Sequence, residues 1–289
     1  MSPPDVTGIL NVNKSTGWTS HDVVARIRRL AAQQRVGHAG TLDPLAEGVL
    51  PVLLGRATRL AEFVQAGRKT YIARVRLGEA TETDDAEGAI VSRAAVPVLS
   101  EAGVIDILAD FQGEILQTPP RYSALKVHGR RAYAVARAGA DLDLAPRPVT
   151  IHDLHLLALE GDQLSLRVTC SKGTYIRALA RDIASRLGTV GYLSALVRTR
   201  VGPFRIEDSL SLDDIAERGV ADCLLPPQRA LPDAPSLTAD ADQARRLANG
   251  QAIDLAGLRG DAVWVYDPDG RLICLGHADG SSLRCRLAL

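Results

Sequence analysis

The chain has 289 residues with 34 basic and 34 acidic side chains, so its formal net charge is 0. Its 46% hydrophobic and 24% charged residues are typical of globular proteins, and its length suits one large or two unequal domains. No stretch reaches the roughly 20 apolar residues of a membrane-spanning helix, and the N-terminus lacks the segments of a signal peptide. The four cysteines form no C-x-x-C pair, which argues against a zinc ribbon or a dense disulfide framework. We therefore expect a soluble protein of the reducing cytoplasm.

The zero net charge is a sum over stretches of opposite sign. Residues 1–80, 121–150 and 166–205 carry net charges of +5, +4 and +7, whereas 81–120 and 206–289 carry −7 and −6. If the three basic stretches converge in space, they supply the Lys/Arg surface that a phosphate backbone requires, and the acidic stretches face away. Charge alone leaves an ordinary solvated surface equally open.

Hydrophobic periodicity predicts helices and strands in mixed order along the chain. The predicted strands cover 6–12, 49–54, 70–77, 147–158, 163–170 and 193–201, and the predicted helices 20–30, 58–66, 100–112, 174–187 and 211–218. Ser20 and Ser100 are expected to cap the helices that they begin. A proline-containing linker near 226–235 is expected to lead into a small β module with a hairpin turn at 267–270.

One segment between these elements is a candidate site. Residues 37–48 hold three glycines and a proline, which predicts an irregular loop between a helix and a buried strand. Asp43 lies in this loop near His38 and is followed by Pro44, so its carboxylate is expected to be held rigidly. Taken singly, Asp43 fits an Asx turn or a helix cap better, Tyr71 fits a core residue, and Arg177 fits a surface cation.

Several familiar catalytic motifs are absent from the sequence. It contains no GxxxxGK[ST], GxGxxG, HExxH or GxSxG, so nucleotide hydrolysis and zinc proteolysis lose support. His152 and His155 lie three residues apart on a predicted strand and are expected to point to opposite faces. We therefore expect no metal site at this pair.

Five segments in one order carry a family resemblance: NKSTGWTSHDVV, RVGHAGTLDPLAEGVLPVLLGRATRL, KTYIARVRLGEATETDDAEG, YSALKVHGRRAYAVAR and CSKGTYIRALARDIA. Over about residues 8–204 they resemble the TruB family of tRNA pseudouridine synthases. The C-terminal module resembles, more weakly, the PUA-like RNA-binding domain of bacterial members. In one departure, Asn13-Lys14-Ser15 stands where the family has aspartate-lysine-proline, which bears on the rigidity of that turn and not on the reaction.

The resemblance implies an α+β protein with the pseudouridine synthase fold, a mixed and largely antiparallel sheet flanked by helices. It implies a catalytic domain at 1–232 with an inserted RNA-clamping segment at about 114–146. A PUA-like RNA-binding domain at 233–289 is expected to follow.

The implied reaction is isomerisation of uridine 55, in tRNA numbering, of the T-arm to pseudouridine. The base is flipped out, and its glycosidic bond is cleaved and re-formed without cofactor or metal. The expected partner is tRNA, with no membrane and no required protein partner, and the expected state is a cytoplasmic monomer.

The matching residues acquire roles through the resemblance. Asp43 corresponds to the essential aspartate, a nucleophile or base, and whether it engages ribose or base first stays open. Tyr71 corresponds to the tyrosine that stacks on the uracil and helps to remove the C5 proton, and Arg177 to the arginine that pairs with the aspartate. The expected substrate-binding residues are Lys14, His38, Lys126, Arg130, Tyr175, Arg181 and Leu196. Of these, His38 is expected to fill the space of the flipped nucleotide and Leu196 to contact the base.

Two other functions remain open. The split basic stretches and the C-terminal module are compatible with an RNA chaperone that assists tRNA folding independently of catalysis. A guide-RNA-dependent relative of the archaeal and eukaryotic type is disfavoured by the short N-terminus and the absence of lysine-rich tails.

Overall fold

The computed structural model describes residues 6–122, 126–127, 130–131 and 144–289. Its main sheet runs in the order β1-β3-β12-β4-β11-β10-β7, with β2 added to β3 and β13 to β12. Within this sheet, β12 and β3 are parallel, and the other pairs are antiparallel. The strands are β1 (Gly8–Lys14), β2 (Val36–His38), β3 (Glu47–Leu54), β4 (Lys69–Leu77), β7 (Gly113–Gln117), β10 (Arg147–Glu160), β11 (Gln163–Cys170), β12 (Gly191–Val201) and β13 (Phe204–Arg205). The expected α+β class with a mixed sheet is confirmed.

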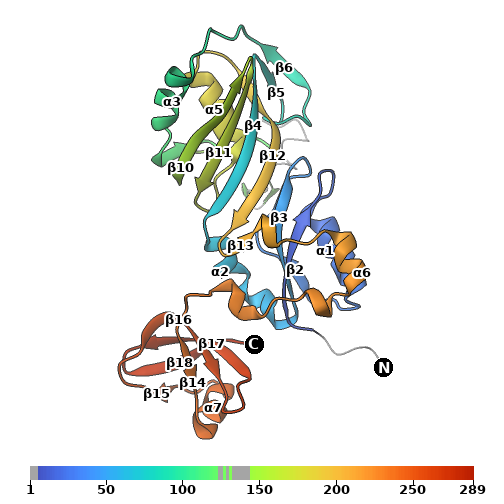
Figure 1. Cartoon of the computed structure of the whole chain (residues 1–289). Helices are drawn as coiled ribbons and strands as arrows, with labels where there is room; N and C mark the ends of the chain where they lie inside the picture. Colours follow the sequence, from blue (N-terminus) through green and yellow to red (C-terminus); the bar gives the residue numbers. More distant parts are fainter. Residues whose placement is uncertain (1–5, 123–125, 128–129, 132–143) are drawn as a thin grey trace.

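Helices flank this sheet in two places (Figure 1). Helices α3 and α5 lie along β10, β11 and β12, and α1 and α6 lie beside β1 and β2. The helices are α1 (Ser20–Leu30), α2 (Ala61–Ala66), α3 (Glu101–Ala109), α5 (Ile176–Arg186) and α6 (Leu212–Arg218), with 3-10 turns η1 (Gly55–Leu60), η2 (Ile206–Asp208), η3 (Ala221–Cys223) and η4 (Pro227–Ala230). Among the described residues, no helix is long and apolar enough to span a membrane.

Strand β4 shows how the sequence pattern becomes the core. Tyr71, Ala73, Val75 and Leu77 alternate with more exposed residues and all four are buried, as the alternation predicts. They join one apolar cluster with the inward residues of α1 and α5. Leu42 and Ala46 belong to the same cluster, so the 37–48 loop packs against the centre of the sheet.

The N-terminus of α1 differs from the prediction. Thr19, not Ser20, is the cap: its side chain accepts a hydrogen bond from the Asp22 amide, and the Asp22 carboxylate accepts one from the Thr19 amide. Ser20 is buried in the first turn and is free to bond elsewhere. Both residues are good caps, so the sequence could not choose between them.

The first residues of the segment expected to be inserted, at about 114–146, lie in the main sheet. Strand β7 pairs with β10, with Ile115 opposite Val149, so residues 114–117 belong to the main sheet. The segment that leaves the sheet begins after Gln117. Two short strands within it, β8 (Lys126–Val127) and β9 (Arg130–Arg131), pair antiparallel. A separate hairpin joins β5 (Glu79–Thr81) and β6 (Ile90–Arg93).

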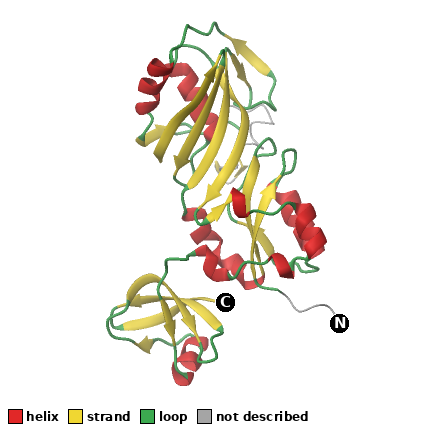
Figure 2. Ribbon diagram, in the orientation of Figure 1, coloured by secondary structure: helices red, strands yellow, loops and turns green. Residues whose placement is uncertain are grey.

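A second sheet of five strands forms the C-terminal module (Figure 2). Its strands are β14 (Ser236–Thr238), β15 (Ile253–Asp254), β16 (Arg259–Tyr266), β17 (Leu272–Asp279) and β18 (Ser282–Ala288), accompanied by α7 (Ala241–Ala248). The expected turn joins β16 to β17, where the Asp267 amide donates to the Arg271 carbonyl at 2.9 Å. Trp264 and Leu275 pack in one apolar cluster with Ile9 and Leu53 of the main sheet. The two sheets thus share a core, and the PUA-like character of the second stays a prediction.

Candidate active site

In the loop between β2 and β3, hydrogen bonds to the backbone of the residues on either side of Asp43 hold this residue in place. The Ser20 hydroxyl accepts a hydrogen bond from the Leu42 amide at 2.8 Å and donates to the Leu42 carbonyl at 3.1 Å. On the other side of Asp43, the Pro44 carbonyl accepts from the Gly17 amide at 2.8 Å and from Lys14 Nζ at 3.3 Å. The carboxylate between these anchors is 37% exposed. The loop therefore presents a fixed and accessible aspartate.

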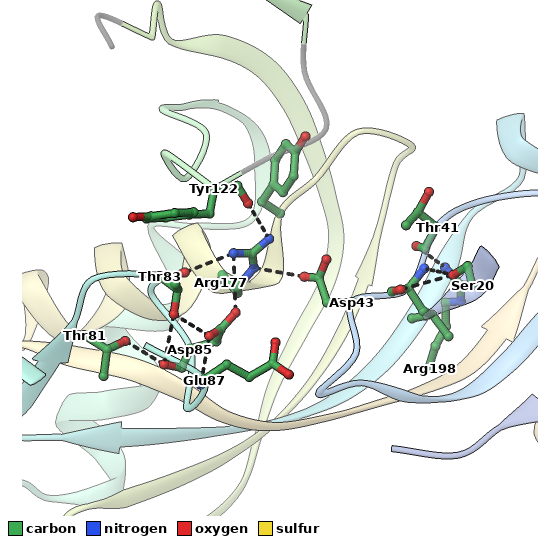
Figure 3. A network of polar contacts seen from close by, with 12 residues as sticks. Ser20, Thr41, Asp43, Thr81, Thr83, Asp85, Glu87, Tyr122, Arg177 and Arg198 are labelled. Carbon is green, nitrogen blue, oxygen red and sulfur yellow. Dashed lines mark hydrogen bonds and ion pairs between the residues drawn. The ribbon is translucent and has the colours of Figure 1, made fainter. Parts of the chain in front are cut away.

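Arg177 contacts this aspartate from the N-terminus of α5 (Figure 3). Its Nε lies 2.9 Å from Asp43 Oδ2, and its Nη1 lies 3.4 Å from Asp85 Oδ2. Nη1 and Nη2 donate to the carbonyls of Thr83 and Tyr122, each at 3.0 Å. A cation at a helix N-terminus is opposed by the helix dipole, and the two carboxylates offset this cost for a buried guanidinium. The predicted pair of Asp43 and Arg177 is thus present.

Asp85 is a site residue that the sequence did not reveal. Its side chain is only 3% exposed and accepts hydrogen bonds from Thr83 Oγ1 and from the Glu87 amide. The neighbouring Asp84 pairs with Arg181 at 2.9 Å. The expectation that the acidic stretch 81–120 faces away is therefore wrong at these two positions. The turn between β5 and β6 contacts α5. A run of acidic residues in the sequence does not indicate which element the turn will contact.

Burial and like charges shift the pKa values of two carboxyls beside the site. Burial raises the pKa of Asp84, and the positive charges of Arg181 and Arg177 oppose this rise. Burial also raises the pKa of Glu87, and repulsion by Asp85 and Asp43 adds to it. The acidic turn thus brings negative charge close to Asp43.

Tyr71 and Leu196 lie on the sheet beneath this loop. Tyr71 on β4 is opposite Arg198 on β12, and Leu196 is opposite Ala73 two residues further along the same pair of strands. Both Tyr71 and Leu196 are buried. Burial raises the pKa of the Tyr71 phenol, while Arg198 opposes the rise and the negative charge of Asp43 adds to it. At neutral pH, Tyr71 therefore offers a neutral aromatic ring.

His38 lies at the end of β2 and contacts a second histidine. Its ring centroid is 6.1 Å from that of His21, and the rings cross at 68°. Burial lowers the pKa of His38, and the charges of His21 and Arg198 lower it further. Among the described residues, its buried Nδ1 has no hydrogen-bond partner. His38 is thus a neutral imidazole beside the loop.

Lys14 and Tyr175 come from two separate elements, the end of β1 and the N-terminus of α5. Lys14 is fully buried and also donates to the carbonyls of Ser15 at 3.0 Å and Trp18 at 2.7 Å. Burial lowers its pKa to about 8. Tyr175 caps α5 with its backbone, which exchanges two hydrogen bonds with the Gln117 side chain, and Arg147 lies 5.0 Å from its ring centroid. The structure gives Lys14 a place in holding the loop and gives Tyr175 a place in holding α5.

The remaining predicted residues belong to the basic stretches. Arg181 lies one turn after Arg177 on α5 and donates to the Thr118 carbonyl at 3.0 Å, besides its pair with Asp84. Lys126 and Arg130 lie in β8 and β9, and their side chains are outside the described part of the chain. Arg137, from the same basic stretch 121–150, also lies outside the described residues. Arg177 and Arg181 on α5 are both paired with carboxylates, so the expected basic surface stays a prediction.

Comparison with known proteins bears directly on this arrangement. The N-terminal domain of TruB family pseudouridylate synthases matches residues 28–176, and the tRNA pseudouridylate synthase B C-terminal domain matches 177–231. The chain is 45% identical over 285 residues to a tRNA pseudouridine synthase B of Thermobifida fusca, with 95% of this chain and 96% of that one covered. It is 45% identical over 278 residues to one of Synechocystis, with coverages of 94% and 93%. Fold, site and relatives together define a pseudouridylate synthase. Within that class, the chain belongs to the TruB family, as the sequence motifs predict.

Solved structures agree with this assignment. A chain of an H/ACA ribonucleoprotein bound to a substrate RNA that contains 2′-deoxyuridine is 26% identical, with a TM-score of 0.72 and coverages of 97% of this chain and 84% of that one. A chain of a Cbf5-Nop10-Gar1 complex is 28% identical, with a TM-score of 0.71 and coverages of 94% and 78%. The pseudouridine synthase fold expected from the resemblance is confirmed.

Proposed function

We propose that this chain converts uridine 55 in the T-arm of tRNA to pseudouridine. The observation that carries the proposal is the accessible Asp43 carboxylate, held 2.9 Å from Arg177 Nε. Both features lie in a chain that matches tRNA pseudouridine synthase B relatives over almost its whole length. The family and these relatives support isomerisation, and they do not support an RNA chaperone that works without catalysis.

The chemistry conserves every atom of the nucleotide. The bond between N1 of uracil and C1′ of ribose breaks, the uracil turns, C5 bonds to C1′, and the C5 proton leaves as N1 gains one. Asp43 is the nucleophile or base that engages the nucleotide during these steps. For this role its carboxylate must carry a negative charge, and that charge lies against the positive guanidinium of Arg177. Asp43 and Tyr71 supply acid–base and covalent chemistry from the chain itself, and the proposal includes no cofactor and no metal.

The other residues bind and place the flipped base. Tyr71 offers its ring to the uracil face, Leu196 lies on the same pair of strands, and His38 takes the space left in the RNA. Lys14 and Tyr175 border this pocket. Arg181 and the strands that carry Lys126 and Arg130 contact the phosphate backbone.

The deciding experiment replaces the carboxylate of Asp43 by an amide of nearly the same shape. We expect Asp43→Asn to abolish pseudouridine formation in a T-arm stem-loop, with RNA affinity within about tenfold of wild type. Asp162→Asn is a matched control, since Asp162 also pairs with an arginine, Arg76, and is 39% exposed. It is expected to turn over normally. Retained turnover by Asp43→Asn would refute the assignment.

The proposal extends to the state in which the chain works. We propose a cytoplasmic monomer that acts on tRNA with no protein partner and no guide RNA. The Cbf5 chain of similar fold was solved in a complex with Nop10 and Gar1, so the point needs its own test. The purified chain is expected to elute as a monomer and to modify naked tRNA. A requirement for a second protein or a guide RNA would contradict this part.

A further inference from the structure

Arg198 on β12 is a buried cation that is paired with backbone carbonyls. Its side chain is 1% exposed. Nη1 donates to the Thr41 carbonyl at 3.2 Å (Figure 3). Nε donates to the Val49 carbonyl at 2.7 Å and Nη2 to the Gly40 carbonyl at 3.0 Å. In the described part of the chain, no carboxylate lies within ion-pair distance of it. Burying a charged side chain without an opposite charge costs free energy, so this arginine is expected to have a specific role.

The three carbonyls belong to the two ends of one loop. Gly40 and Thr41 precede Asp43 in the chain, and Val49 follows it at the start of the buried part of β3. One guanidinium therefore closes the loop that carries the catalytic carboxylate. A guanidinium can bind carbonyls on both sides of Asp43 because it is planar and presents several N–H donors in fixed directions. All the donors of a lysine side chain lie on one nitrogen.

The backbone of Arg198 occupies a special place in the sheet. Arg198 is the direct neighbour of Gly48 on β3 and of Tyr71 on β4. A Cβ atom on Gly48 would lie 2.3 Å from the Arg198 carbonyl oxygen, and Gly48 has a φ of +100°. The strands approach so closely that only glycine fits at the end of the loop. Arg198 therefore lies in a single row between the Asp43 loop and Tyr71.

The electrostatic neighbourhood agrees with that placement. Burial lowers the pKa of Arg198, whereas the Tyr71 hydroxyl and the Asp43 carboxylate raise it. These are the two side chains that must face the same uracil. Arg198 thus interacts with both while it remains out of reach of solvent.

We propose that Arg198 is a positioning residue for the isomerisation. Its guanidinium joins the two ends of the loop and sets the separation of Asp43 from Tyr71. The inference rests on the proposed function, since the spacing matters only if these two groups act on one base. A displacement of about 1 Å in such a pair can cost on the order of a hundredfold in rate.

A residue that merely stabilised the fold would lower the melting temperature and leave the rate of the folded protein unchanged. The test therefore separates chemistry from binding and folding in the full-length chain. Arg198→Met and Arg198→Lys are compared with wild type and with Arg76→Met, which removes a surface arginine from β4. Single-turnover pseudouridine formation is measured on a T-arm stem-loop with saturating enzyme. RNA affinity and melting temperature are measured alongside.

We expect both Arg198 variants to remain folded at 25 °C with lower melting temperatures. Their single-turnover rates are expected to fall by about a hundredfold, with RNA affinity within about threefold. Arg198→Lys should not restore the rate, because one ammonium cannot reach carbonyls at both ends of the loop. Arg76→Met should match wild type.

Four results would overturn the inference. These are a wild-type rate in Arg198→Met, full rescue by Arg198→Lys, a loss of RNA affinity as large as the loss of rate, and failure of both variants to fold. The last would show that Arg198 is needed for the fold as a whole. If wild type and Arg76→Met also form no pseudouridine, the proposed function itself fails, so the two failures are distinguishable.

Discussion

Arg177 Nη1 lies 3.4 Å from Oδ2 of Asp85, a carboxylate that is almost completely buried. The same guanidinium contacts Asp43 through Nε, and Asp43 is partly exposed. Asp85 is itself fixed by Thr83 and by the Glu87 amide. The buried carboxylate thus orients the arginine, and the accessible one is the carboxylate that we propose faces the nucleotide.

Asp85→Asn is expected to weaken this arrangement without changing its shape. Loss of the second negative charge should destabilise the chain by about 1.5–3 kcal/mol, the range for a hydrogen bond to a charged group. The single-turnover rate should fall because Arg177 is less firmly directed to Asp43. Urea unfolding and pseudouridine formation measure the two effects. A variant as stable and as fast as wild type would show that Asp85 does not orient Arg177.

Ser20→Ala tests the anchor on the other side of the loop. The Leu42 amide and carbonyl both lose their partner in a buried position, so we expect a loss of about 1–3 kcal/mol in the free energy of unfolding, together with a slower reaction. Thr16→Ala is the matched control, because the Thr16 hydroxyl makes exposed contacts of 3.5 Å and 3.4 Å with Leu45 and Glu47. Its effect is expected to stay within about 0.5 kcal/mol. Equal effects of the two variants would contradict the anchor.

The sequence predicts helices and strands correctly where apolar residues recur with a clear period. The alternation in β4, the capped helix α3 after Ser100 and the strands β10 and β11 all occur as expected. The pairing of Asp43 with Arg177 was implied by family motifs, and the structure shows it. These features depend on local pattern or on recognisable motifs, which a single chain records.

The features that were missed depend on register and direction. Arg198 faces Tyr71 because β12 lies between β3 and β4, an order that periodicity does not contain. His152 and His155 were expected on opposite faces, but both are exposed, since a bulge between Ile151 and Asp153 interrupts the alternation. One extra residue in a strand changes the face to which the following side chains point.

Trp264 is expected to be the main anchor of the C-terminal module. It is buried against the main sheet, and its Nε1 donates to the Leu231 carbonyl at 3.0 Å. Trp264→Ala should cost about 3–5 kcal/mol, measured by urea unfolding, because a large side chain leaves a cavity between the two sheets. Trp18→Ala removes the other tryptophan, which is 38% exposed, and should cost much less. Comparable losses would show that the shared cluster contributes little.

Lys14 should make stability depend on pH in alkaline solution. Burial lowers its pKa from 10.5 to about 8, so between these values the folded chain holds fewer protons at this site than the unfolded chain. The contribution of Lys14 to the free energy of unfolding therefore rises with pH across this window, by at most about 1.4 kcal/mol per pH unit. Below pH 8 the lysine is protonated in both states, and the contribution is constant.

The measurement is the difference in unfolding free energy between wild type and Lys14→Met, determined in urea at pH 7, 8, 9 and 10. Subtraction cancels the other groups that titrate in this range, because they are shared by both proteins. We expect the difference to be flat from pH 7 to about 8 and then to move in favour of wild type. Lys172→Met, at an exposed lysine, is the control and should give a flat difference throughout. A flat difference for Lys14→Met would mean that the three carbonyls around Nζ keep the ammonium charged in the folded chain.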